Sequence, residues 1–138
     1  MSNEQEYPHP SVPRAWRDLA CICEELHARL YRDGDQESAL RLLPNLETLL
    51  NSVPESEFAI VRAEALGLYH ELRGEMSLAI QHRKREITLL QMLHEDIEKN
   101  AYDAETKAYL LNGHDVSTLE ERIDIVKALE SRLGIPGI

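Results

Sequence analysis

Apolar residues recur at steps of three and four along most of the chain. The first such stripe runs through Trp16, Leu19, Ala20, Cys23, Leu26 and Leu30. This spacing places the apolar side chains on one face of an amphipathic helix, which Gly34 is expected to end. Nowhere does an alternating apolar and polar run with turn signals on both sides indicate a strand. The pattern therefore predicts an all-α fold.

Further helical segments follow the first stripe. The pattern predicts them over about residues 36–51, 56–73, 76–111 and 117–133. Pro44 lies in the middle of the first of these segments, and its ring should kink or split the helix there.

The segment over residues 76–111 admits two structures because it contains neither Gly nor Pro. Its apolar residues, from Ile80 to Leu111, fit a heptad seam. One long helix could present this seam to a second copy of the chain, giving a self-associating structural bundle. Asn100 and Asp103 are good cap residues, and we expect them to break the helix between Lys99 and Asp103.

Composition and charge are typical of one folded domain. The chain has 138 residues, of which 43% are hydrophobic and 29% charged, enough for a core of its own. The formal net charge of −10 argues against partners such as nucleic acid or an anionic membrane surface. With no apolar run of bilayer length and a polar N-terminus, we expect a cytoplasmic protein. Residues 1–12 are expected to form an extended tail, and residues 13–138 a single helical-repeat domain.

Three glycines stand at nearly equal intervals. Gly34, Gly74 and Gly113 are 40 and 39 residues apart, and each is expected at the turn between two helices. Such a period predicts stacked antiparallel helix hairpins, here three of about 40 residues, with glycine in the left-handed conformation at the corners. A closed antiparallel helical bundle with hairpins of equal length would explain the same glycines.

Around the second corner the sequence resembles the tetratricopeptide-repeat (TPR) family and its longer-period relatives. The matching residues are Leu66, Gly67, Gly74 and Ala79 in the second unit and Leu26, Gly34 and Ala39 in the first. The resemblance covers about residues 20–91. It implies a short TPR-like α-solenoid in which Gly67 and Ala79 face each other and let the two helices of a hairpin approach closely.

The same resemblance implies a groove lined by the first helix of each hairpin. Its partner-binding residues here would be Glu24, Ala28, Tyr31, Val61, Glu64, Leu68 and Glu71. Carboxylates at these places would repel the C-terminal carboxylate of a peptide and attract a basic or amphipathic segment. We therefore expect an adaptor that binds a partner protein or peptide, and whose uncapped apolar ends favour a homodimer or a place in a larger assembly.

Motifs for catalysis and for metal binding are weak in this sequence. The chain contains no HExxH, no P-loop and no G-x-S-x-G motif, and its one Glu-x-x-His within a predicted helix, at Glu24 and His27, is half of what a di-iron bundle needs. We expect no metal, no cofactor and no enzymatic activity. A deep polar pocket with converging carboxylates and histidine would reopen the question of an enzyme.

Two local features have a structural interpretation. The basic run from His82 to Arg85 fans around a helix axis and so forms no one-sided patch. We expect Arg83, Lys84 and Arg85, followed by Glu86, on a solvated face. Cys21 and Cys23 lie two residues apart on a helix and cannot bridge each other. We expect both to be small buried helix residues.

Overall fold

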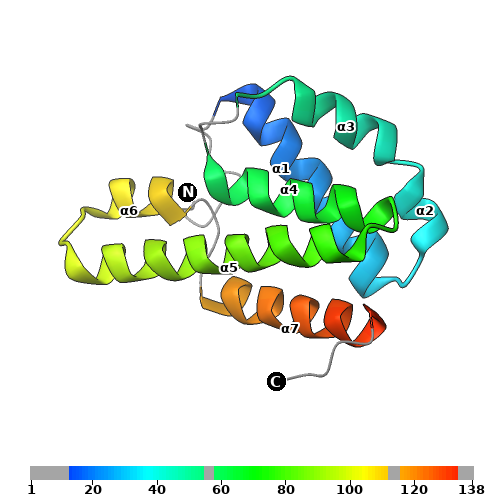
Figure 1. The fold of residues 1–138 in the computed structure, drawn as a ribbon. Helices are drawn as coiled ribbons and strands as arrows, with labels where there is room; N and C mark the ends of the chain where they lie inside the picture. Colours follow the sequence, from blue (N-terminus) through cyan, green and yellow to red (C-terminus); the bar gives the residue numbers. More distant parts are fainter. Residues whose placement is uncertain (1–12, 55–57, 112–115, 134–138) are drawn as a thin grey trace.

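In the computed structural model, which describes residues 13–54, 58–111 and 116–133, the chain forms an all-α fold (Figure 1). The fold class predicted from the sequence is therefore confirmed. The expected N-terminal tail, residues 1–12, and the expected third corner, Gly113, lie outside the described residues.

Seven α-helices and one π-helical turn follow one another in the described part of the chain. Their bounds are α1 Arg14–His27, η1 Ala28–Arg32, α2 Gln36–Leu40, α3 Leu43–Asn51, α4 Ala59–Leu72, α5 Met76–Lys99, α6 Ala104–Leu111 and α7 Val116–Leu133. Not one of these helices combines the length and the apolar character that crossing a membrane requires.

Pro44 splits the second predicted segment, as expected. A turn at residues 41–42 separates α2 from α3, and Pro44 lies in the first turn of α3. A proline is tolerated there because the first N–H groups of a helix have no partner within the helix.

The segment over residues 76–111 is also broken where the sequence predicted. Asn100 is extended, with φ −113° and ψ 142°, and ends α5. Asp103 then accepts a hydrogen bond of 2.7 Å from the N–H of Thr106, which caps the start of α6. The alternative prediction of one continuous helix over residues 76–111 is therefore wrong. Ile80 and Leu90, two members of its proposed seam, are buried inside the domain.

Two of the three glycine corners are confirmed. Gly34 has φ +63° and Gly74 has φ +79°, the left-handed region that glycine enters without steric cost. Gly74 joins α4 to α5, which lie side by side as an antiparallel hairpin (Figure 1).

The remaining helices pack on the two sides of this hairpin. Helices α1 and α3 pack against α4 and against each other, whereas α7 packs along α5 (Figure 1). Within the described residues α6 packs on α5 and has no extended interface with α7, so these two helices do not form the expected third hairpin. The reason is the apolar face of α7, whose Ile125, Val126 and Leu129 form a buried cluster with Ala79 and Ile80 of α5.

The larger hydrophobic core lies between α1, α3 and α4 and contains Trp16, Leu19, Leu26, Leu46, Val61 and Leu68. At one end of it the rings of Trp16 and Phe58 lie 5.2 Å apart between centroids. Phe58 precedes α4 with φ 45°, a left-handed conformation that is strained for a residue with a side chain.

Gly67 lies directly against the side chain of Arg83, a neighbour that the TPR resemblance did not imply. A Cβ added at Gly67 would lie 2.9 Å from Cδ of Arg83, so the absent side chain makes room for Arg83 of α5. Ala79 is fully buried, but its cluster is the one between α5 and α7. That these two small residues face each other stays a prediction.

Candidate functional site

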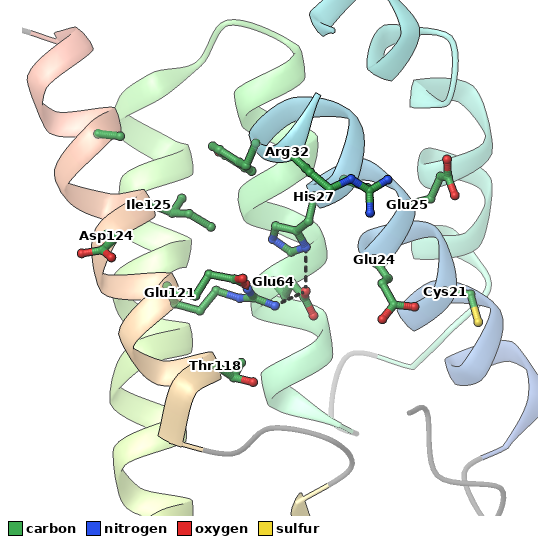
Figure 2. Close-up of a pocket in the computed structure, with 14 residues that line it drawn as sticks. Cys21, Glu24, Glu25, His27, Arg32, Glu64, Thr118, Glu121, Asp124 and Ile125 are labelled. Atoms are coloured by element: carbon green, nitrogen blue, oxygen red, sulfur yellow. Dashed lines mark hydrogen bonds and ion pairs between the residues drawn. The ribbon is translucent and has the colours of Figure 1, made fainter. Parts of the chain in front are cut away.

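A pocket of about 940 Å³ opens between α1 with η1 on one side and α7 on the other (Figure 2). Helix α4 contributes Glu64, which lies between the two walls. The charged lining residues are Glu24, Glu25, Glu64, Glu121, Asp124, Arg32 and Arg122, and Ala28, Ile125 and Ala128 add apolar atoms. Carboxylates thus outnumber guanidinium groups in the lining.

Contacts across this region show that α1, α4 and α7 run in the same direction. His27 contacts Glu64, and Tyr31, one turn further along, contacts Glu71. On the other side Glu64 contacts Arg122, and Glu71 contacts Arg132. On each side of α4, a contact that lies further toward the C-terminus of α4 also lies further toward the C-terminus of its partner segment.

Arg122 of α7 joins α4 and α5 through buried carboxylates. Its Nη2 donates to Oε2 of Glu64 and its Nε to Oε2 of Glu86, each at 2.8 Å. The remaining nitrogen, Nη1, donates to Glu121 on α7 itself. All three nitrogens of Arg122 therefore bond to carboxylates, and the side chain is 7% exposed.

The same network extends to α1 through Arg83. Its Nη1 donates to Oε1 of Glu86 at 2.9 Å, and its Nη2 lies 2.8 Å from Nε2 of His27. Since a guanidinium can only donate, Nε2 of His27 must accept, which leaves the proton of a neutral imidazole on Nδ1. Nδ1 lies 3.2 Å from Oε2 of Glu64.

Two buried cations and two buried anions balance each other in this network. Arg83 and Glu86 are fully buried, and Glu64 is 1% exposed. Removing such charges from water is costly, so each is stable only while its partners are in place. Burial raises the pKa of Glu64 to about 7, whereas the nearby Arg122 works against that rise.

A second, partly buried set of contacts lies one to three turns further along, on η1, α4 and α7. The hydroxyl of Tyr31 donates to Oε1 of Glu71, and Nη1 of Arg132 lies 3.3 Å from its Oε2. Burial raises the pKa of Tyr31, although Arg83 opposes this rise. Glu71 is therefore paired inside the domain.

The residues predicted to bind a partner divide into two groups. Glu24, Ala28, Tyr31 and Glu64 line the pocket, so the structure brings these four together.

The other three, Val61, Leu68 and Glu71, are buried and do not belong to the pocket lining. Val61 and Leu68 are core residues between α1, α3 and α4, because α4 is covered by other helices on most of its surface. Their assignment to a partner-binding surface is therefore wrong. Glu71 likewise cannot offer a free carboxylate to a partner.

Sequence reasoning placed Arg83 and Glu86 on a solvated face, and this is wrong because both are fully buried. A signal for it was present, since residues 79, 83, 86 and 90 lie on one helical face together with the apolar Ala79 and Leu90. Arg122 likewise lies on the buried face of α7 that carries Ile125 and Leu129.

The two cysteines differ in their surroundings. Cys23 is buried in the core, as expected, but Cys21 is exposed and lines the pocket. Burial and the charge of Glu24 raise the pKa of the Cys21 thiol, which disfavours the reactive thiolate.

The polar atoms around Glu64 are mostly engaged with one another. Both ring nitrogens of His27 and all three nitrogens of Arg122 face protein partners. Two buried atoms of the network are exceptions: Oε1 of Glu64 and Nε of Arg83 have no hydrogen-bond partner in the described part of the chain. The arrangement can therefore hold four helices together and offer one acceptor oxygen to a ligand.

Comparison of the chain with protein-family models, with curated proteins and with solved structures gives no match. The pocket and its charges are therefore the features from which a function can be proposed.

Proposed function

We propose that this chain is a non-enzymatic interaction module that holds a basic, amphipathic segment of a partner protein in the pocket between α1 and α7. The observation that carries the proposal is the composition of the pocket. Carboxylates exceed guanidinium groups in its lining, and alanine and isoleucine side chains lie among them. Charge and apolar contact together favour a ligand that is both cationic and amphipathic.

Glu24 supplies the least compensated charge on the α1 side. It is exposed, and within the described residues no hydrogen bond or ion pair engages its carboxylate. Figure 2 shows its side chain extending from α1 toward the space beside Glu64. A cationic group entering the pocket would therefore meet Glu24 before it reached the buried network.

The parallel course of α1, α4 and α7 supports a TPR-like groove. In the TPR family the first helices of successive hairpins line the concave face. On this proposal α7, and not α6, takes the third such place, because it contacts α4 through Arg122 and packs along α5. The rigid, charge-balanced network would keep the groove open in the absence of a partner.

The test uses two synthetic helical peptides of Leu, Ala and Lys, or of Leu, Ala and Glu, each carrying a fluorophore. Binding is followed by fluorescence anisotropy. The lysine peptide should bind and the glutamate peptide should not. Raising the salt concentration should weaken binding, because the contact includes exposed charges.

Glu24→Lys should weaken binding of the lysine peptide by roughly threefold to tenfold, since it reverses a charge at the opening of the pocket. The matched control is Glu98→Lys, an equal charge change at an exposed position near the end of α5. Circular dichroism should show the same helicity for both variants. Equal loss of binding in the two variants would contradict the proposed site.

A further inference from the structure

Glu64 combines three properties that the rest of the network does not share. It lines the pocket, it is 1% exposed, and its Oε1 has no hydrogen-bond partner among the described residues, while its Oε2 faces both Arg122 and His27. A buried acceptor without a donor is unfavourable, and such an atom in a pocket is satisfied when a ligand supplies the donor. Figure 2 shows Glu64 between the two walls of the opening.

From this geometry we infer that the pocket accepts the side chain of one lysine of the partner, whose ammonium group donates a hydrogen bond to Oε1 of Glu64. The origin of that lysine rests on the proposed function, which supplies a basic segment. The inference adds the residue type that enters the pocket and the atom that receives it.

The choice of lysine over arginine follows from the number of free oxygens. A guanidinium group binds a carboxylate best through two parallel hydrogen bonds, which require both oxygens. Oε2 of Glu64 already accepts from Arg122. The single free oxygen suits an ammonium group, whose other two protons can face Glu24 or water at the opening.

The apolar part of the pocket fits the stem of the same side chain. Three apolar residues line the pocket together with the carboxylates: Ala28 of η1, and Ile125 and Ala128 of α7. The four methylene groups of lysine can pack on these atoms while the charged end reaches a polar partner. The excess of carboxylates in the lining offsets the repulsion between the incoming ammonium group and Arg122.

The probe for this inference is n-butylammonium chloride, which reproduces a lysine side chain without a peptide. It is titrated into the full chain while NMR follows the carboxyl carbon of Glu64 and the Nε–H group of Arg122. Sodium chloride at equal ionic strength, n-butanol and n-butylguanidinium are titrated in parallel. Both signals should shift to saturation with butylammonium and shift little with sodium chloride or butanol.

Two variants show whether the effect arises at the proposed atom. Glu64→Gln should weaken butylammonium binding by about tenfold or more, because a charge-assisted hydrogen bond is lost. Ala28→Leu fills part of the pocket while every residue of the network is retained, and it should also abolish the shifts. Ala101→Leu, at an exposed position between α5 and α6, should not. The Ala28 variant retains the test if Glu64→Gln fails to fold.

The outcomes separate this inference from the proposed function. Shifts no larger than those with sodium chloride, or shifts that Ala28→Leu leaves unchanged, would overturn the lysine site even if the lysine peptide still binds near Glu24. Butylguanidinium binding as tightly as butylammonium would contradict the choice of lysine. Saturable butylammonium binding without any peptide binding would support the ammonium site and overturn the proposed function.

Discussion

The side chain of Arg83 lies directly against Gly67, in the space that a methyl group at Gly67 would occupy. A Cβ at this position would lie 2.9 Å from Cδ and 3.0 Å from Nε of Arg83. Arg83 is fully buried and holds Glu86 and His27, so its position cannot shift without disturbing the network. The glycine on α4 is therefore a requirement of a buried arginine on α5.

Gly67→Ala should lower the free energy of unfolding by about 1–3 kcal/mol, because it overpacks a buried site. Urea denaturation followed by circular dichroism measures the change. The sign of the change in stability shows whether the site is crowded, since alanine in an uncrowded helix interior would raise the free energy of unfolding by roughly 0.5–1 kcal/mol. A more stable variant would show that Arg83 has room to move.

Arg122→Ala should lower the free energy of unfolding by about 3–5 kcal/mol, because it leaves the buried carboxylates of Glu64 and Glu86 without their shared partner. The matched control on the same helix is Arg132→Ala. Arg132 is 47% exposed and contacts Glu71 at 3.3 Å, so its loss should cost at most about 1 kcal/mol. Equal effects in chemical denaturation would contradict a special role for the buried network.

The stability of the protein should depend on pH through Glu64. Its pKa is raised by burial to about 7 from an ordinary value of 4.5, so the folded state keeps the proton to a higher pH than the unfolded state. Between these two values a rising pH therefore lowers the free energy of unfolding. Below 4.5 and above about 7 the contribution of Glu64 is constant.

The measurement compares wild type with Glu64→Gln by urea denaturation between pH 4 and 8, a range that spans the ordinary and the raised pKa of Glu64. The charged and titratable groups that face Glu64 are Cys23 and His27 on α1, Arg83 and Glu86 on α5, and Arg122 on α7. All five remain in the variant. The difference between the two curves should fall by a few kcal/mol at most as the pH rises, and a flat difference would refute the raised pKa.

Phe58→Ala should destabilise the fold and shift the fluorescence of Trp16 to longer wavelength. Trp16 is the single tryptophan of the chain and is 2% exposed. Its ring lies 5.2 Å from that of Phe58, and removing that ring opens the site to water. A loss of about 2–4 kcal/mol is expected for truncating a large core side chain that is only partly buried.

A second variant at residue 58 distinguishes the effect of losing the aromatic ring from the effect of relieving the backbone strain. Phe58→Gly removes both the ring and the strain of φ 45°, so it should be more stable than Phe58→Ala by about 1 kcal/mol. Both variants should show the same fluorescence shift. An unshifted emission maximum would mean that Phe58 does not shield Trp16.

Much of the local structure follows from single residues, and the sequence determined it. Gly34 and Gly74 turn the chain because their left-handed conformation is costly for other residues. Pro44 starts a new helix because it lacks an N–H, and Asp103 starts another because its carboxylate caps the first turn. These effects depend on residues a few positions apart, so a sequence pattern is sufficient to predict them.

Only the tertiary structure decided which charged residues are inside and which helix α7 accompanies. Arg83, Glu86 and Arg122 resemble surface residues by type, and they are stable in the interior because three helices bring matching charges together. Glu64 lines the pocket, whereas Leu68, one turn further along α4, is in the core. Such contacts join residues 36–58 positions apart, and the pairing depends on how whole helix faces pack, which no local pattern records.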